Sequence, residues 1–384
     1  MLVGGLGTWM QFTTLTFFVA QLAGTPARAA LNVGLLGAAR AVAVLSASPF
    51  AGVVADRYPR RRILMLTNAS ASCLSLTLAV LTVLHAITIP MILVLAACLG
   101  ATQAFDSPAR QSWIPFLVPR EDVANAIGLG QFAFNAPSVL GPPIAGFLIV
   151  TTGIATSFFV NAATVLAVLS AVVLMQPLAA QGKVHESIFR SMAGGIGFLA
   201  RHAVLRWVIL TLLINATLLR PYTFLLSAYA LHVVHTDARG LGFLLASGGT
   251  GAMCGTVLTA AVPTRQRARR WCLAAATMAA GMLGLGLTHS FAVAVGALFL
   301  LGLGNLSFTG ASNILIQTLA PSDIRGRAIS VYSMILLGMV PAGTLILGSI
   351  AAATNLSATL TGAGVVALVA LAWTWVAHPA LRSA

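Results

Sequence analysis

The densest cluster of ionisable side chains in this 384-residue chain is GVVADRYPRRR, residues 52 to 62. It holds one carboxylate, Asp56, and four guanidinium groups, whereas the sequence around it is almost uncharged. A carboxylate in such a cluster can pair with a cation or meet the positive N-terminus of a helix. The chemistry we expect here is therefore electrostatic contact between segments.

Two further cations, Arg40 and Arg220, lie inside apolar stretches. A charge at the centre of a bilayer costs roughly 2.5 to 3.5 kcal/mol on insertion scales, so such residues usually face a cavity or a partner. One interpretation is that both arginines attract an anionic or acceptor-rich substrate. The other is that they reach the membrane surface or bind backbone carbonyls structurally. The polar residues we expect to line a cavity with them are Gln11, Gln131, Asn135, Asn215 and Tyr222.

The composition indicates that lipid is the solvent for most of the chain. Hydrophobic residues make up 59% of it and charged residues 7%, whereas soluble domains carry roughly 25% charged residues. The net charge of +14 does not predict nucleic-acid binding, because the basic residues fall between apolar stretches. The four cysteines lie in apolar stretches without metal-ligand spacing, so we expect buried thiols, no metal site and no cofactor.

The apolar stretches predict an all-α membrane protein, because a spanning helix needs about 20 such residues. Twelve candidates fill the chain and leave no room for a separate soluble domain. The expected spans are 2–22, 31–55, 63–86, 88–105, 123–151, 154–177, 205–231, 239–262, 271–288, 291–316, 327–352 and 357–378.

Basic residues predict the orientation of these spans. Of the 21 basic residues, 17 lie in loops after even-numbered spans or on the C-terminal tail, and two lie in the opposite loops. The positive-inside rule then places both termini in the cytoplasm. The first stretch leaves an alternative open, a signal peptide ending near ARA at 27–29, but it lacks a basic start. We favour a chain that begins inside its first span.

An internal repeat predicts two related halves. LVPREDVANAI (117–127) aligns with LAPSDIRGRAI (319–329), and the same offset pairs Gly141 with Gly343 and Gly146 with Gly348. These stretches precede and enter the fifth and eleventh spans, so the repeated unit has six spans. We expect an N-terminal half at 1–177, a cytoplasmic linker with an amphipathic helix at 178–204, and a C-terminal half at 205–384.

GVVADRYPRRR resembles the signature loop of the major facilitator superfamily, a class of transporters. Gly52, Asp56, Arg57, Arg60 and Arg61 match its pattern, while Pro59 replaces the usual second glycine. The resemblance implies a twelve-helix fold and a conformational latch between the halves. We expect Asp56 to meet the start of the eleventh span, and Arg60 to pair with an acid on the fourth. The partners expected there are Arg325, Gly326 and Asp106. Topology-setting charges that contact lipid headgroups are the alternative.

Residues 104–149 resemble the branch that includes the enterobactin exporter and macrolide-efflux permeases. Within them, PSVLGPPIAG is similar to the antiporter motif of drug-efflux members through Gly141, Pro142 and Gly146, whereas Pro137 and Ala145 depart from it. Close packing of small residues is an equally good interpretation. The expected partner of this span is the eighth span, which contains the glycines Gly242, Gly248, Gly249, Gly251 and Gly255.

We expect a secondary transporter that exports an amphiphilic small molecule, a drug or a siderophore, by alternating access in a prokaryotic inner membrane. No carboxylate falls in the middle of a span, so proton coupling is implied by the resemblance alone. Uptake of a small metabolite is one alternative. An enzyme or a sensor is another, although no catalytic cluster lies within the spans and no soluble output segment is present. The expected partners are the substrate, lipid and a proton, without nucleic acid.

Overall fold

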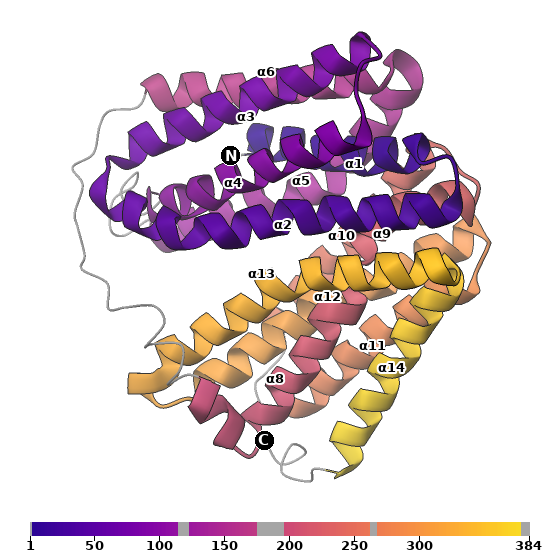
Figure 1. Cartoon of the computed structure of the whole chain (residues 1–384). Helices are drawn as coiled ribbons and strands as arrows, with labels where there is room; N and C mark the ends of the chain where they lie inside the picture. Colours follow the sequence, from indigo (N-terminus) through magenta and orange to yellow (C-terminus); the bar gives the residue numbers. More distant parts are fainter. Residues whose placement is uncertain (1, 114–122, 175–195, 262–266, 378–384) are drawn as a thin grey trace. The chain divides into compact units, whose positions relative to one another are not determined.

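A computed structural model describes residues 2–113, 123–174, 196–261 and 267–377 (Figure 1). All its regular elements are helical. The N-terminal helices are α1 (Leu2–Leu22), α2 (Pro26–Arg57), α3 (Arg60–Val83), α4 (Ile89–Trp113), α5 (Val123–Thr152) and α6 (Ile154–Leu174). The later helices are α8 (Leu205–Ile214), the π-helix η3 (Asn215–Leu219), α9 (Tyr222–His232), α10 (Ala238–Ala261), α11 (Arg267–Leu287), α12 (Phe291–Leu319), α13 (Ser322–Ala353) and α14 (Leu356–Ala377).

The predicted all-α membrane architecture is confirmed. In the described ranges, eleven helical stretches are long and apolar enough to cross a membrane, and α8, η3 and α9 together form one of them, Leu205–His232. The described apolar part of α5, Ala136–Thr152, accounts for the remaining predicted span. Helices suit this role because each satisfies its backbone hydrogen bonds internally, where lipid offers no partners.

The chain forms two compact units. Unit 1 contains residues 1–184 and 235–246, and unit 2 contains residues 185–234 and 247–384. The start of α10 belongs to unit 1 because it packs against α5. The predicted linker at 178–204 lies largely outside the described residues, apart from a helical turn at 196–201. Its boundaries and its amphipathic helix therefore stay predictions.

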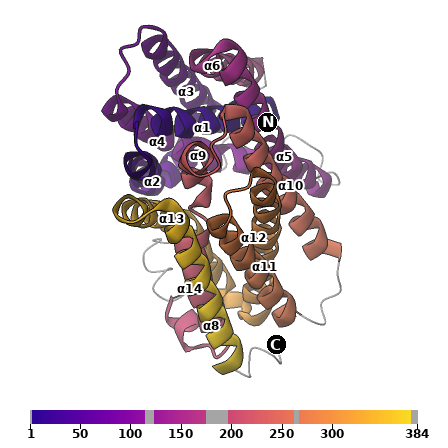
Figure 2. The same cartoon turned by 90° about the vertical axis from the view of Figure 1, so that its right-hand side faces the viewer.

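The two units repeat one pattern of helix contacts. In unit 1, α1 packs with α5 and α6, and α3 packs with α4 and α6. In unit 2, the span containing η3 packs with α13 and α14, and α11 packs with α12 and α14. Figures 1 and 2 both show α3 beside α6. The paired glycines occupy equivalent contacts, since Gly141 lies against α1 and Gly343 against η3.

Helix α1 is an integral part of unit 1. Val19 and Ala20 are fully buried, and Thr14 forms a hydrogen bond of 2.6 Å to Ser157 on α6. A segment with these contacts is a structural helix of the unit, which argues against the signal-peptide interpretation.

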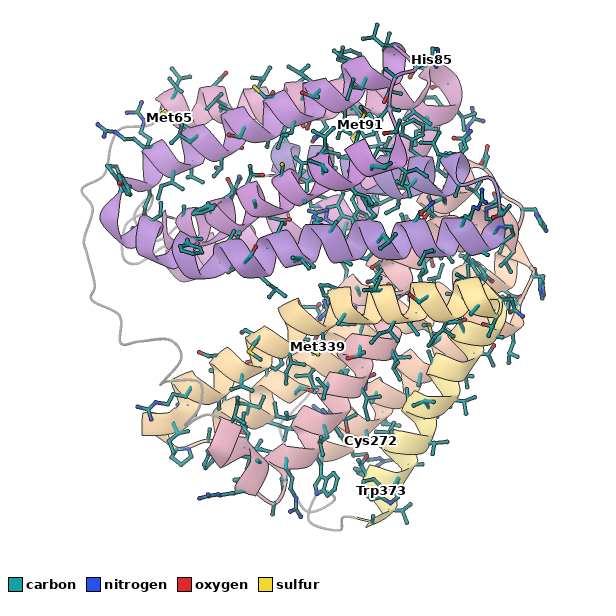
Figure 3. The ribbon with its side chains drawn as sticks, viewed as in Figure 1. Met65, His85, Met91, Cys272, Met339 and Trp373 are labelled. Atoms are coloured by element: carbon teal, nitrogen blue, oxygen red, sulfur yellow. The ribbon has the colours of Figure 1, made fainter. Side chains whose placement is uncertain are left out.

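Large apolar side chains cover the outside of the helices, as a lipid environment requires. Val42, Leu66, Val94 and Leu287 are each more than 60% exposed. Small and polar residues instead line many helix contacts, which is the usual arrangement when lipid replaces water. Nitrogen atoms gather towards the helix ends, as the blue atoms of Figure 3 show. The expectation of buried thiols was wrong for the exposed cysteines Cys73, Cys98 and Cys254.

Two histidines occupy backbone positions with positive φ at turns between spans. His85 ends the turn after α3 with a φ of 52°, and His235 precedes α10 with a φ of 53°. At the first turn, the amide of Ala86 donates to the Leu81 carbonyl at 3.1 Å, which closes the helix end. Figure 3 labels His85 at this turn. The residue therefore shapes a helix end.

Candidate functional site

The cluster at residues 52–62 spans the end of α2 and the start of α3. Tyr58 ends α2, with its amide donating to the Val54 carbonyl at 3.0 Å. Pro59 starts α3 with a φ of −57°, and its carbonyl accepts from the Arg62 amide at 2.8 Å. Proline adopts this φ without strain and needs no donor at a helix start. The replacement of the usual glycine therefore suits the local backbone.

Arg61 caps the end of a neighbouring helix. Its Nε donates to the Val172 carbonyl at 3.1 Å, and its Nη2 donates to the Val173 carbonyl. Both carbonyls belong to the last turn of α6, where no further residue of the helix can satisfy them. A guanidinium also interacts favourably with the negative end of the helix dipole. Arg61 therefore joins α3 to α6.

The predicted pairing of Arg60 with Asp106 was wrong. In the described part of the chain, Asp106 pairs with Arg110 on its own helix, where Nε and Nη2 each donate at 2.9 Å to a different carboxylate oxygen. Thr67 and Asn68 on α3 donate to the same carboxylate at 3.2 and 3.1 Å. The spacing of four residues places Arg110 one helical turn from Asp106 on the same face of α4, which favours this pair.

The remaining latch residues have unequal outcomes. The surroundings of Gly52 and the side chains of Asp56 and Arg57 are outside the described part of the structure. The eleventh span, α13, begins at Ser322, so Arg325 completes its first turn and Gly326 follows that turn. The Arg325 amide donates to the Pro321 carbonyl at 2.8 Å, and this bond closes the first turn. The latch between the halves stays a prediction.

The antiporter-like residues of α5 form contacts with two helices. Gly141 faces α1, where an added Cβ would lie 2.8 Å from the Trp9 Cβ. Gly146 faces the start of α10, and a Cβ there would overlap the Ala238 carbonyl oxygen. The Pro142 carbonyl of α5 lies against Gly242 of α10. These residues allow backbones to approach closely, as small residues do in membranes.

The predicted contact between α5 and α10 is present, and the glycines of α10 divide between two neighbours. Gly242 packs against Pro142 and Pro143 of α5. Gly251 and Gly255 instead face the Phe299 and Leu303 carbonyl oxygens of α12. The beginning of α10 therefore packs against α5, and its later part packs against α12.

Arg40 has a neutral partner within unit 1. It lies near the middle of α2, and its Nη2 donates to the Gln103 Oε1 of α4 at 2.6 Å. The backbones are close here, because a Cβ on Gly100 would overlap the Arg40 carbonyl oxygen. The Gln103 carbonyl thus compensates part of the charge, which supports the structural interpretation of Arg40.

Arg220 lies near the middle of the Leu205–His232 span, directly after η3. Its amide donates to the Asn215 carbonyl at 3.1 Å, closing the wider π turn. Tyr222 and Tyr332 lie near enough to the guanidinium for electrostatic interaction. Both tyrosines are buried, and the Tyr332 hydroxyl donates to the Thr309 carbonyl at 2.9 Å. Arg220, Tyr222 and Tyr332 therefore place three polar side chains near this turn of unit 2.

An apolar cavity of about 350 Å³ lies elsewhere, between α3 and α4. Thr77, Leu81, Pro90, Met91, Val94 and Leu95 line it, and Figure 3 labels Met91. It contains none of the predicted substrate residues, and a surface of this composition suits an acyl chain. We therefore do not assign it to the transport site.

Comparison with known proteins decides the family. The family described as "Transmembrane secretion effector" matches residues 1–383. The chain belongs to this major facilitator family. The transporter is similar over its whole length to proteins of known structure with the same fold. A D-xylose–proton symporter gives a TM-score of 0.74 at 15% identity, over 100% of this chain and 97% of the symporter.

Two curated relatives share this transporter's length. The staphyloferrin A transporter of Staphylococcus aureus is 26% identical over 347 residues, covering 89% of this chain and 85% of the relative. The multidrug efflux pump Tap of Mycolicibacterium fortuitum is 25% identical over 377 residues, covering 93% and 89%. The family and these relatives are transporters, so the chain is a transporter and not an enzyme.

Gln11 belongs to the packing of unit 1 and not to an open cavity. It is 6% exposed, and its Nε2 donates to the Ser75 Oγ at 3.1 Å. The Nδ2 of Asn161 donates to the Gln11 Oε1 at 2.7 Å and to the Ser75 Oγ at 2.9 Å. Because this network joins α1, α3 and α6, we remove Gln11 from the substrate candidates.

The other cavity candidates differ in what the structure describes. Gln131 and Asn135 have side chains outside the described residues. Asn215 is 3% exposed, and its Nδ2 donates to the Thr211 carbonyl at 2.8 Å. Its Oδ1 has no hydrogen-bond partner in the described structure. Arg220 and Tyr222, which follow η3 directly, are therefore the candidates whose side-chain donors have no hydrogen-bond partner among the described residues.

Replacing Asn161 by Ala is expected to lower the free energy of unfolding by about 1 to 2 kcal/mol, because the buried Gln11 carbonyl loses its donor. Thermal unfolding of the purified transporter measures the change. Thr77→Ala is the control, since this exposed hydroxyl bonds within its own helix. Equal melting temperatures for Asn161→Ala and wild type would contradict the network.

Sequence reasoning missed Gln103, Ser75 and Asn161. For Gln103 there was a signal, because it shares one face of α4 with Asp106 and Arg110, at spacings of three and four residues. For Ser75 and Asn161 there was none, because single polar residues in apolar helices do not show which neighbour they face.

Proposed function

We propose that this transporter exports an amphiphilic small molecule of the drug or siderophore kind. The observation that carries the proposal is the similarity over most of the chain to a siderophore transporter and a multidrug efflux pump. The antiporter-like residues Gly141, Pro142 and Gly146 are compatible with it, because they place α5 against α1 and α10. The names of the two relatives, a staphyloferrin A transporter and a multidrug efflux pump, support export. The apolar composition of the spans suits a substrate with apolar surface.

Alternating access of the two units across a prokaryotic inner membrane is the mechanism we propose. The basic loops after even-numbered spans support cytoplasmic termini. The charged turn between α2 and α3 is proposed as a latch in this cycle, with Asp56 meeting the start of α13 and Arg60 a partner still to be identified. Arg61 contributes by holding α3 to the end of α6.

Proton exchange is the coupling that the family resemblance supports. The two carboxylates whose side chains the structure describes are already bound. Asp106 is held by Arg110, and the Asp237 Oδ1 accepts from the Gly240 amide at 3.0 Å at the start of α10. Both therefore have a structural contact within their own unit. We therefore propose that proton exchange drives transport, and we assign no residue to the proton.

Cells that overproduce the transporter are expected to accumulate at least one amphiphilic drug or siderophore at least twofold less than cells with an empty vector. An uncoupler should remove the difference, because the proton gradient would no longer drive export. Gly296→Ala serves as a folded control, since an added Cβ there meets nothing within 4 Å. Accumulation of a panel of labelled compounds measures the effect.

Higher accumulation in the overproducing cells would support the uptake alternative in place of export. Equal accumulation of every compound, with folded protein in the membrane, would remove the proposal. A difference that persists with the uncoupler would retain export and remove proton coupling.

A further inference from the structure

The backbone around Arg220 is held in an unusual conformation. The π-helix η3 interrupts the span before this residue, and single π turns occur often at functional sites. Helix α13 packs tightly on the turn, because a Cβ on Gly343 would overlap the Thr217 carbonyl oxygen and lie 2.7 Å from the Pro221 ring. The place of the Arg220 backbone is thus fixed by its own turn and by α13.

Arg220 and Tyr222 each have a donor group that the structure leaves unused. Across the described ranges, the Arg220 guanidinium forms no hydrogen bond and no ion pair. The Tyr222 hydroxyl likewise has no hydrogen-bond partner among the described residues, although the side chain is only 6% exposed. The hydroxyl lies close to Gly248 of α10, where an added Cβ would come within 3.3 Å of the oxygen. Both groups can therefore donate to a ligand.

The surroundings favour a negatively charged ligand. The sequence places no carboxylate inside the apolar part of any span of unit 2. A cation inside a membrane span is costly without a partner. The neighbouring Tyr332 is electrically neutral, and its proton is already donated to the Thr309 carbonyl. Arg40 differs, because its Nη2 already donates to the Gln103 carbonyl oxygen.

We propose that the Arg220 guanidinium and the Tyr222 hydroxyl bind one carboxylate of the exported molecule. This inference rests on the proposed export function and adds the charge of the substrate. A guanidinium presents two parallel N–H groups that match the two oxygens of a carboxylate, and a phenol hydroxyl supplies a third donor. Tyr332 acts as a positioning residue beside the guanidinium. The substrate is then an amphiphilic anion.

A matched pair of probes separates charge from shape. The full-length transporter, purified in a neutral detergent, is titrated with 4-phenylbutyrate and with 4-phenylbutyramide, and apparent affinities are obtained from the rise in melting temperature. The acid is expected to bind at least about tenfold more tightly than the amide, because hydrogen bonds to charged groups are the stronger ones. A second titration with anionic phosphatidylglycerol present tests whether a lipid headgroup competes.

Variants assign the effect to residues. Arg220→Gln is expected to remove the preference for the acid, Arg220→Lys to keep part of it, and Tyr222→Phe to weaken it several-fold. Arg40→Gln is the matched control, an intramembrane arginine with a protein partner, and should retain the preference. If Arg220→Gln does not fold, Arg220→Lys and Tyr222→Phe still give the answer.

Equal affinity of the wild type for acid and amide would overturn the proposal, and so would an acid preference that survives Arg220→Gln. Loss of the preference in Arg40→Gln but not in the Arg220 variants would move the site to unit 1. Complete competition by phosphatidylglycerol would identify a lipid site in place of a substrate site. Acid preference without drug export in cells removes only the proposed function, whereas export without acid preference removes only the anion site.

Discussion

Replacing Gly302 by Ala is expected to lower the free energy of unfolding by about 2 to 3 kcal/mol, or to prevent folded protein from accumulating. A methyl group on Gly302 would overlap the Gly248 carbonyl oxygen of α10 and lie 2.8 Å from the carbonyl carbon. Backbone atoms cannot rotate away, so α10 and α12 must separate. Separation would also disturb the contacts of Gly251 and Gly255 on the same face of α10.

A control for this experiment lies on the same helix. Gly296 belongs to α12, and a Cβ there meets no atom within 4 Å. Gly296→Ala should therefore be neutral or stabilise the helix by up to about 1 kcal/mol, because alanine is the better helix former. Thermal unfolding and monodisperse yield in detergent compare the two variants. Equal behaviour of Gly302→Ala and Gly296→Ala would contradict the close packing of α10 and α12.

Replacing Arg110 by Met is expected to lower the free energy of unfolding by about 1 to 3 kcal/mol. The change leaves the Asp106 carboxylate with Thr67 and Asn68 as its described donors and removes the paired charge. The two side chains are 27% and 21% exposed, so water compensates part of the loss, and the cost is smaller than for a fully buried pair.

The double variant Asp106→Asn/Arg110→Met separates the pair from its parts. Since a neutral amide does not need a cation, the double variant should be less destabilised than the sum of the two single variants. Thermal unfolding of the four proteins gives the coupling energy. Additive effects would show that the ion pair contributes nothing to stability and that Asp106 has a different principal partner.

Much of the fold followed from local sequence. Apolar stretches of spanning length predicted the helices, and the offset that pairs Gly141 with Gly343 predicted two related halves. The two units have matching helix contacts, although unit 1 also includes residues 235–246, which the prediction placed in the C-terminal half. These features are local because lipid requires every span to satisfy its own backbone hydrogen bonds and to be apolar along its length. The charged turn between α2 and α3 was also recognisable, since its residues are contiguous.

The pairing of polar side chains could not be predicted in the same way. Asp106 was expected to pair with Arg60 and pairs with Arg110, and Gln11 was expected in a cavity and lies in a buried network. In water, the apolar face of a helix indicates which side packs inward. In lipid both the inward and the outward face can be apolar, so this indication is lost.

The sequence by itself therefore predicted a membrane transporter of twelve spans in two related halves. It also placed two arginines, Arg40 and Arg220, within spans. Only the tertiary structure decided that Gln103 accepts a hydrogen bond from the first of them, and that the guanidinium of the second has no hydrogen-bond or ion-pair partner among the described residues. The physical reason is that span length and loop charge are properties of one segment, whereas the partner of a buried polar group depends on the rotation of each helix against its neighbours.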